Sequence, residues 1–422
     1  MTGVISAFEY DLLGDENAKI SGVVPLPSEV FKYLEAMALS EYGCQFLKVT
    51  ARNNQRLLQV QNYAGMLFTP LGHQLEILPK VGRNLTKEKA RETLVTMLSY
   101  LSGFRHIQTQ ESSVQTYSRP LLEIFISQFL QSLSLLLKKG LRSDYREHSD
   151  NLTFMKGRLN VSAQLRHNVI HRDKFFVSYE EYSPDNAANR LLHSALNKLS
   201  KMQLAAENQQ WIQELRFVFD DIPVSRDIDA DISQLRFGRN MVHYETPVEW
   251  AKLILTGMSP MALQGEAKSL SLLFPMEVVF ESFVAQTIAD ELPPGLTVKS
   301  QFSGLSLVRH QEKDLFSLRP DLVIQKGVPA KNNLVMDTKW KLINGNMRNQ
   351  YGLSQSDLYQ MFAYGQKYLA GEDQGAMYLI YPEQDNFTAP IRHHFEFSNT
   401  LKLWVVPYRI TANQGQRFSL QQ

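Results

Sequence analysis

LRPDLVI at residues 318–324 and LVMDTKW at residues 334–340 determine how the C-terminal part of this chain folds. Both stretches are short, apolar at their centres and rich in β-branched residues, which is typical of strands. The residues between them, 326–333, include glycine, proline and asparagine, which favour a turn. We therefore expect two adjacent strands joined as a hairpin.

Acidic and basic side chains fall at defined positions of this hairpin. Because side chains alternate across a strand, Asp337 and Lys339 lie on the same face of theirs. Asp321 lies on the partner strand, on the face opposite Leu322 and Ile324, and can meet Asp337 across the pair. Two carboxylates and the backbone carbonyl beside Asp337 are oxygen ligands of the kind that Mg²⁺ prefers. We expect a metal site with Asp321 and Asp337 as ligands and with Lys339 beside a metal-bound water.

This combination of side chains suits phosphodiester hydrolysis. The reaction needs a hard cation that neutralises charge on the phosphate and lowers the pKa of water, and a cationic side chain that orients the water or the transition state. The acidic-x-Lys triplet alone is weak evidence, because chance copies such as Glu266-Ala267-Lys268 occur in a chain of this length. The alternative is a solvated strand face on which Asp337 and Lys339 form an exposed ion pair of little energetic value.

An expected helix before the hairpin carries a further acidic candidate. Residues 274–288 have Pro275 near the first turn and apolar residues at helical spacing, with Glu281 beside that apolar face. A carboxylate there is costly unless it is paired or bound to a metal, so Glu281 is a candidate third ligand. Glu277, one turn earlier, is an alternative, and a third possibility is that both glutamates face solvent.

A second helix is expected after the hairpin, at residues 354–369, with Ser354 or Ser356 as its cap. Gln360 and Tyr364 lie one turn apart on it. They resemble the Q-x-x-x-Y element that follows the catalytic strands in the RecB-like branch of PD-(D/E)xK nucleases, and the hairpin resembles the signature of that class. The alternative is an ordinary amphipathic helix in which Tyr364 packs inward.

Several motifs together resemble the McrC family, the nuclease subunit of McrBC modified-cytosine (5-methylcytosine) restriction systems. The resemblance rests mainly on MDTKWK at residues 336–341, DLYQMFAY at residues 357–364 and MYLIYP at residues 377–382. Looser similarities extend upstream, namely KGL at 139–141, MKGRL at 155–159 and DNAANRLL at 185–192. The resemblance therefore covers residues 120–410.

The resemblance implies a Mg²⁺-dependent DNA endonuclease that works with another protein. The site residues it implies are Asp321, Asp337, Lys339, Glu281, Gln360 and Tyr364. The implied partner is a hexameric McrB-like AAA+ GTPase, which this subunit binds and stimulates and which reads the modified base in double-stranded DNA. The sequence has no Walker-type G-x-x-x-x-G-K-[ST] motif, so a nucleotide-driven motor must be another chain. One active site per chain suggests that two copies meet for a double-strand cut.

Composition sets the broad class of protein. A chain of 422 residues that is 44% hydrophobic suffices for two or three domains. The longest apolar run, 121–137, is interrupted by polar residues, so we expect neither secretion nor membrane insertion. The single cysteine, Cys44, excludes an internal disulfide and fits a reducing cytoplasm. Because the net charge is +1, DNA contact must use local basic patches; the candidates are residues 138–146 and 166–174, although such clusters usually form solvated surfaces.

We expect an α+β multidomain protein. Residues 1–82 are predicted to form a β-rich interaction module, residues 83–265 a mostly helical region that binds the partner, and residues 266–422 a PD-(D/E)xK nuclease domain with a mixed sheet flanked by helices. The strands expected in the last domain are residues 297–308, 315–325, 334–340, 376–381, 391–397 and 403–410. Residues 227–231 carry alternating aspartates but lack the glycine and terminal glutamate of a calcium loop, so an acidic loop is predicted.

Two other functions fit the sequence. One is a RecB-like repair or recombination nuclease, which would need a helicase partner and would act on DNA ends. The other is a non-catalytic adaptor that activates a partner NTPase, although the intact set of Asp321, Asp337 and Lys339 argues against it. Metal-dependent cleavage separates these functions.

Overall fold

The computed structural model of the chain divides into two compact units. Unit 1 comprises residues 1–121 and 258–422, and unit 2 comprises residues 122–257. The residues that the structure describes are 4–18, 20–40, 45–69, 72–82, 86–101, 117–170, 173–238, 241–256, 271–327, 331–370, 375–410 and 417. Cys44 and the chance triplet at 266–268 lie outside them. The N-terminal and C-terminal segments of the sequence therefore share one unit.

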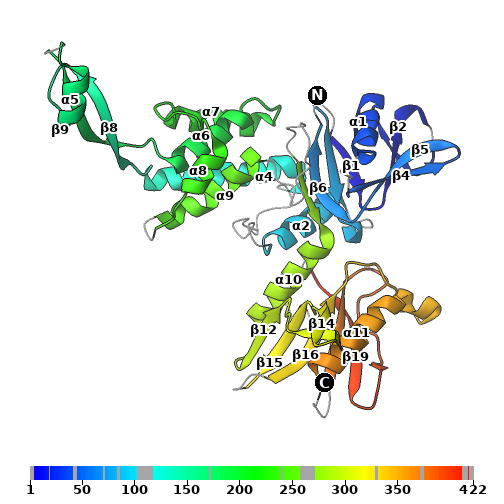
Figure 1. Cartoon of the computed structure of the whole chain (residues 1–422). Coiled ribbons are helices and arrows are strands. Elements are labelled where there is room, and N and C mark those ends of the chain that lie inside the picture. Colours follow the sequence, from blue (N-terminus) through cyan, green and yellow to red (C-terminus); the bar gives the residue numbers. More distant parts are fainter. Residues whose placement is uncertain are drawn as a thin grey trace. The chain divides into compact units, whose positions relative to one another are not determined.

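Two four-stranded sheets form the N-terminal part of unit 1 (Figure 1). The first sheet has the order β3-β2-β5-β4 and packs against helix α1; its elements are β2 Leu12–Asp15, β3 Val23–Leu26, α1 Ser28–Ala38, β4 Leu47–Arg52 and β5 Gln55–Val60. The second has the order β1-β7-β6-β11; its strands are β1 Val4–Phe8, β6 Tyr63–Phe68, β7 Gln74–Leu78 and β11 Ser271–Pro275. Leu13, Leu34 and Ile77 belong to one apolar core that both sheets share. Helix α2, Lys87–Leu98, packs against β7.

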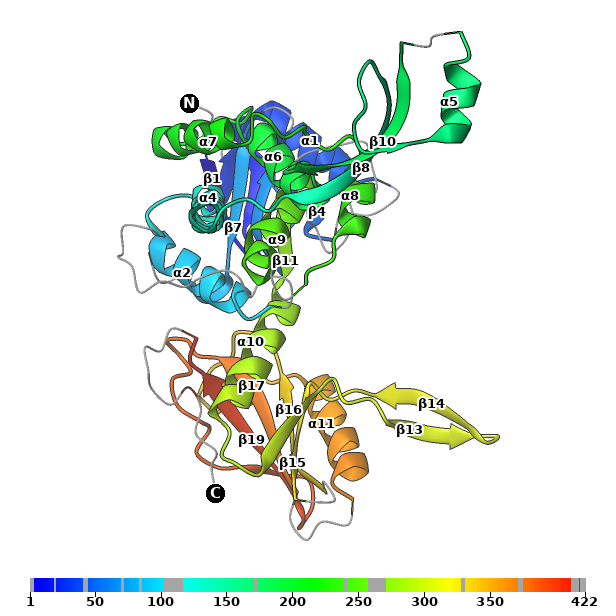
Figure 2. The same cartoon turned by 90° about the vertical axis from the view of Figure 1, so that its left-hand side faces the viewer.

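Strand β11 comes from late in the sequence and completes the second N-terminal sheet. It pairs antiparallel with β6, with Leu273 opposite Gly65. A Cβ at Gly65 would lie 1.9 Å from the carbonyl oxygen of Leu272, and the φ of Gly65 is +135°, so only glycine fits there. Helix α10, Met276–Glu291, follows β11 directly (Figure 2), and its first N–H donates to the carbonyl of Asn62 at 3.1 Å. The N-terminal sheet therefore fixes the start of α10.

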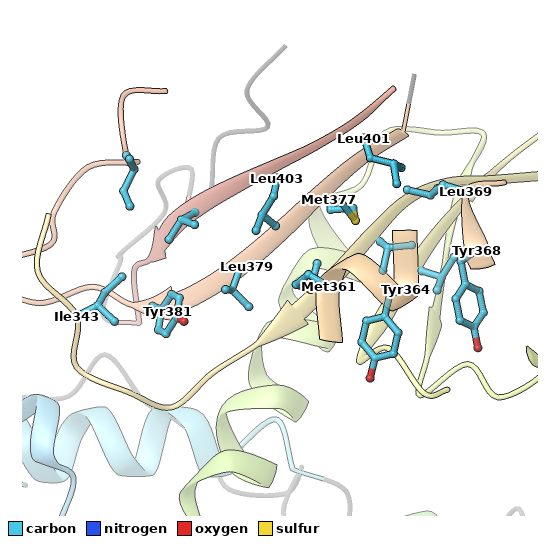
Figure 3. Close-up of a cluster of buried hydrophobic side chains, with 14 of the residues drawn as sticks. Ile343, Met361, Tyr364, Tyr368, Leu369, Met377, Leu379, Tyr381, Leu401 and Leu403 are labelled. Carbon is cyan, nitrogen blue, oxygen red and sulfur yellow. The ribbon is translucent and has the colours of Figure 1, made fainter. Parts of the chain in front are cut away.

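A six-stranded mixed sheet forms the C-terminal part of unit 1. Its order is β12-β15-β16-β17-β19-β18; β12, β15 and β16 are antiparallel, whereas β16, β17 and β19 are parallel. The elements are β12 Leu296–Ser300, β15 Leu322–Lys326, β16 Lys331–Thr338, helix α11 Gln355–Tyr368, β17 Gly375–Pro382, β18 Phe395–Glu396 and β19 Leu401–Tyr408. Met361 of α11 packs on the face that includes Leu379 and Leu403 (Figure 3), whereas Phe283 of α10 contacts Tyr408 on the other face. The predicted α+β class is confirmed.

Two of the strands predicted for this region were wrong in their bounds. Residues 297–308 and 315–325 were each expected to form one strand, but each is divided between two sheets. The chain turns at Gln301, whose φ is 45°, and again at Arg319-Pro320. The outer halves, β13 Leu305–His310 and β14 Lys313–Leu318, pair only with each other and form a ribbon that extends away from the six-stranded sheet (Figure 2). The strand expected at 391–397 is limited to β18.

Unit 2 combines helices with a three-stranded antiparallel sheet that the sequence did not predict. The helices are α4 Leu121–Lys139, α5 Val161–His167, α6 Ala187–Leu199, α7 Ala206–Val218, α8 Ile228–Gln234 and α9 Val242–Thr256. The sheet has the order β8-β10-β9, with strands β8 Asp144–Leu152, β9 Arg158–Leu159 and β10 Phe175–Ser183, and the long strands β8 and β10 pair antiparallel (Figure 2). Strand β8, with the sequence DYREHSDNL, has too few apolar residues to show a strand pattern. The basic stretches 138–146 and 166–174 belong to this unit, and residues 171 and 172 of the second stretch lie outside the described part of the chain.

The acidic stretch of unit 2 is not a loop, contrary to the prediction. Asp227 caps helix α8 by accepting a hydrogen bond from the backbone N–H of Ala230 at 3.0 Å. Asp231, inside the helix, is buried and pairs with Arg190, which also pairs with Asp185. These aspartates therefore serve helix capping and ion pairing.

Helix α4 is long and apolar enough to cross a membrane by length and composition alone. Half of its most apolar stretch is buried inside the protein, including Phe125, Phe129 and Leu133. A buried core helix accounts for this composition.

Candidate active site

Asp321 and Asp337 meet at one end of the antiparallel pair β15 and β16. Leu322 lies opposite Met336, and the same register places Asp321, just before β15, opposite Asp337. One oxygen of Asp321 accepts hydrogen bonds from the backbone N–H and the hydroxyl of Thr338, at 2.7 and 2.6 Å. These bonds fix the carboxylate beside the end of β16, although burial raises its pKa.

The carboxylate of Asp337 is the most unusual group of the site. The residue is 1% exposed, and Oδ2 lies 2.5 Å from the ammonium of Lys339. Apart from this ion pair, neither carboxylate oxygen has a hydrogen-bond partner among the described residues. Burial, and then the negative charge of Asp321, raises the pKa of Asp337 to about 7. Oδ2 is compensated by the Lys339 ammonium, but Oδ1 is buried without a hydrogen bond, so the carboxylate favours a further proton or cation at Oδ1.

Lys339 follows the last residue of β16 and remains attached to the sheet. Its backbone N–H donates to the carbonyl of Ile380 in the parallel neighbour β17, at 2.8 Å. Burial alone would lower the pKa of Lys339, but the carboxylates of Asp337 and Asp321 outweigh this effect and raise the pKa. The ammonium is therefore charged at neutral pH.

Glu281 lies close enough to Asp321 for the two charges to interact. One oxygen accepts a hydrogen bond from the side-chain amide of Gln301 at 2.9 Å. Burial, and then the charge of Asp321, raises the pKa of Glu281. The alternative residue, Glu277, is exposed one turn earlier, where its charge acts on Tyr10 and Lys80. Of the two glutamates, only Glu281 interacts with an aspartate of the pair, Asp321.

Gln360 and Tyr364 are bonded to each other on α11. The amide of Gln360 donates to the hydroxyl of Tyr364 at 2.7 Å, and that hydroxyl donates to the carbonyl of Arg319 at 2.9 Å. The ring of Tyr364 is buried in the apolar cluster beneath α11 (Figure 3), so it also packs inward, as the alternative expected. Burial, and then the charge of Asp337, raises the pKa of Tyr364 to about 12. The pair therefore ties α11 to the segment that leads into Asp321.

The sequence did not predict a role for Asp357, a second buried carboxylate near Asp337. Asp357, in the first turn of α11, accepts two hydrogen bonds from Lys341, at 2.8 and 3.0 Å, and one from the hydroxyl of Tyr381, at 3.3 Å. Burial, and then Asp357, raises the pKa of Tyr381. The alternation in Asp337-x-Lys339-x-Lys341 was a signal that could have placed Lys341 near this site.

The acidic groups suit a partly hydrated Mg²⁺ better than a fully enclosed one. Within the described part of the chain, no group of three or more His, Cys, Asp or Glu side chains is arranged to hold a metal ion. Mg²⁺ usually takes only one or two carboxylates and keeps several waters, and Asp337 offers buried oxygens that lack hydrogen bonds. Asp321 and Asp337 therefore fit this ion, whereas Glu281 is not arranged with both of them as a third ligand.

The chain belongs to the family of McrBC 5-methylcytosine restriction system components, whose family model matches residues 58–382. This match confirms the resemblance to McrC, and it includes every candidate site residue. A curated relative, the type IV methyl-directed restriction enzyme EcoKMcrBC of Escherichia coli K12, is 22% identical over 313 residues, which is 72% of this chain and 87% of the relative. A solved McrC, bound to McrB AAA+ hexamers of Thermococcus gammatolerans, has a TM-score of 0.68 at 19% identity and covers 97% of this chain and 96% of its own. The two chains therefore share a fold.

Proposed function

We propose that this chain is the Mg²⁺-dependent endonuclease subunit of a modification-dependent, type IV restriction system, with a site of the PD-(D/E)xK class. Asp337 carries the proposal, because its buried Oδ1 lacks a hydrogen-bond partner among the described residues while its Oδ2 pairs with Lys339. Such a carboxylate becomes favourable when a proton or a cation neutralises it. Membership of the McrBC family supports a restriction function over the repair nuclease and the adaptor.

Each residue has a defined task in this proposal. Asp321 and Asp337 hold the metal, and Glu281 adds negative charge beside them. When bound, Mg²⁺ supplies positive charge at the scissile phosphate and lowers the pKa of water. Lys339, whose ammonium lies against Asp337, orients or deprotonates that water and places positive charge beside the phosphate.

Gln360 and Tyr364 support the site from α11. Their hydrogen bonds hold the carbonyl of Arg319, two residues before Asp321. Because small displacements of catalytic groups lower rates strongly, this support helps to keep Asp321 opposite Asp337.

A hexameric AAA+ GTPase is the proposed partner, by analogy with the solved McrC that is bound to McrB AAA+ hexamers. In this proposal unit 2 and the N-terminal sheets contact the ring and stimulate GTP hydrolysis in the cytoplasm. The partner reads modified double-stranded DNA, and two copies of this chain meet for a double-strand cut.

Cleavage of methylated and unmethylated plasmid tests this function. The reactions contain Mg²⁺, with or without GTP and the NTPase encoded beside this gene, and compare wild type with Asp337→Asn, Asp337→Ala and Asp290→Asn. Asp290 is exposed on α10 and serves as the matched control. We expect cutting only with partner, GTP and methylation, complete loss in both Asp337 variants with folding and partner binding retained, and normal cutting by Asp290→Asn.

Other outcomes would replace the proposal. Cutting that depends on free DNA ends and not on methylation would favour the repair nuclease. Stimulated GTP hydrolysis without any cutting would favour the adaptor. Wild-type cleavage rates from Asp337→Ala would refute the assignment of the site.

A further inference from the structure

Trp340, between the two lysines of the site, is held by the N-terminal part of unit 1. The side chain is 2% exposed, and its indole N–H donates to both carboxylate oxygens of Glu9 at 3.0 Å. Its carbonyl accepts a hydrogen bond from the ammonium of Lys80 at 2.7 Å. Both the side chain and the backbone of one residue are therefore fixed by groups that precede it by more than 250 positions.

Glu9 and Lys80 form a closed buried pair in the N-terminal sheet. Glu9 is 0% exposed and Lys80 is 7% exposed. Glu9 directly follows β1, and Lys80 lies two residues after the end of β7, the parallel neighbour of β1. The backbone N–H of Lys80 donates to Glu9 at 2.8 Å, and the Lys80 ammonium lies 4.0 Å from the same carboxylate. The rings of Tyr10 and Trp340 lie 4.9 and 5.5 Å from that ammonium. Removing either residue would leave the other charge buried without its partner, which is costly, so this arrangement needs both residues.

The position of Trp340 decides what this contact does. The chain makes a three-residue turn there, closed by a hydrogen bond from the Lys341 N–H to the Lys339 carbonyl at 2.9 Å. Lys339 pairs with Asp337 on one side of the turn, and Lys341 pairs with Asp357 on the other. Holding Trp340 therefore sets the backbone from which Lys339 reaches the acidic pair.

We propose that Glu9 and Lys80 are positioning residues for the nuclease site, which place Lys339 by holding Trp340. The inference rests on the proposed function and adds that residues of the N-terminal sheet region help to position the active site. A second connection agrees with it: β11 of the same sheet leads directly into α10, which carries Glu281. A partner that alters the conformation of the N-terminal sheet would thereby shift the positions of both Lys339 and Glu281.

Hydrogen–deuterium exchange tests the positioning without any need for cleavage. The variants are Glu9→Ala, Lys80→Met and Trp340→Phe, with Trp404→Phe as the matched control, because Trp404 lies in β19 and its ring contacts His394, away from this contact. We expect faster exchange in peptides that include residues 337–341 in the three variants and unchanged exchange in α11. Unchanged exchange at 337–341 in Glu9→Ala would overturn the inference.

Single-turnover cleavage then tests the consequence for the reaction. With partner and GTP present, we expect Glu9→Ala and Trp340→Phe each to lower the maximal rate about 10- to 100-fold with little change in the DNA concentration at half-maximal rate. The double variant should be no slower than the slower single variant, because both changes break the same contact. Glu9→Gln keeps an acceptor for the indole N–H and should recover most of the rate.

The outcomes separate the two proposals. If wild type does not cleave, the proposed function fails, while exchange still decides whether Glu9 holds the turn. If wild type cleaves but the variants cleave at the wild-type rate below their unfolding temperature, the positioning role is overturned. Additive effects of Glu9→Ala and Trp340→Phe would also overturn it.

Discussion

Replacing Asp337 by asparagine should stabilise the metal-free protein at alkaline pH. Burial raises the pKa of Asp337 from its ordinary value of 3.8 to about 7. The unfolded chain therefore loses this proton near pH 4, whereas the folded chain keeps it until pH 7, so stability falls between these values and is constant above them. The difference corresponds to about 4 kcal/mol at most, because one pKa unit is about 1.4 kcal/mol.

The neutral amide of Asp337→Asn removes this cost. At pH 8 in EDTA we expect its unfolding temperature to exceed that of wild type by about 8 °C or more, since about 2–4 °C corresponds to 1 kcal/mol in a unit of this size. At pH 4 the two proteins should unfold at nearly the same temperature.

Metal ions should reverse the order of stability. Mg²⁺ that binds at Asp337 stabilises wild type by mass action and leaves Asp337→Asn nearly unchanged. Differential scanning fluorimetry over pH 4–8, with Mg²⁺ or EDTA, measures both effects, and Asp290→Asn serves again as the control. Equal unfolding temperatures of wild type and Asp337→Asn at pH 8 in EDTA, or equal stabilisation of both by Mg²⁺, would refute this reasoning.

Two other substitutions probe the supports of the site. Tyr364→Phe removes the hydrogen bond to the Arg319 carbonyl, and we expect it to lower stability by about 1–2 kcal/mol in chemical denaturation and to slow cleavage about tenfold. Tyr359→Phe, at an exposed tyrosine of the same helix, should change neither stability nor cleavage. Gly65→Ala places a Cβ against β11 and should lower stability by about 3 kcal/mol or more, while Gly238→Ala, where a Cβ meets no atom within 4 Å, should leave the unfolding temperature within 2 °C, about 0.5 kcal/mol.

The local geometry around Asp337 could be predicted from the sequence because it depends on short-range rules. Strand alternation and a hairpin turn are enough to place Asp321 opposite Asp337 and Lys339 beside it. Helical spacing is enough to place Glu281 at the edge of an apolar face and Gln360 one turn before Tyr364. The roles of these residues stay predictions, since geometry alone does not show chemistry.

Long-range pairing explains what the sequence did not predict. Strand β11 was not predicted, and the helix expected from residue 274 begins only at Met276, because no local signal says that residues 271–275 pair with β6, which lies about two hundred residues earlier. The split of residues 297–308 depends on a single left-handed residue, Gln301, and β8 acquires its structure by pairing with β10 and not by burying an apolar face. The contact of Glu9 with Trp340 is of the same kind, because each residue alone reads as an ordinary member of a strand region.

The topology of the C-terminal sheet explains why the site and the N-terminal sheet are connected. The antiparallel neighbour of β16 is β15, and the start of β15 brings Asp321 to the C-terminal end of β16. The parallel neighbour is β17, whose Ile380 carbonyl accepts a hydrogen bond from the Lys339 N–H. The carboxylates and the lysine therefore gather where the sheet changes from antiparallel to parallel pairing. The chain leaves that point through Trp340, whose ring packs against Phe280 of helix α10 with 5.3 Å between the ring centroids. Because α10 begins in the N-terminal sheet, a site at this end of β16 is in contact with that sheet as a consequence of the fold.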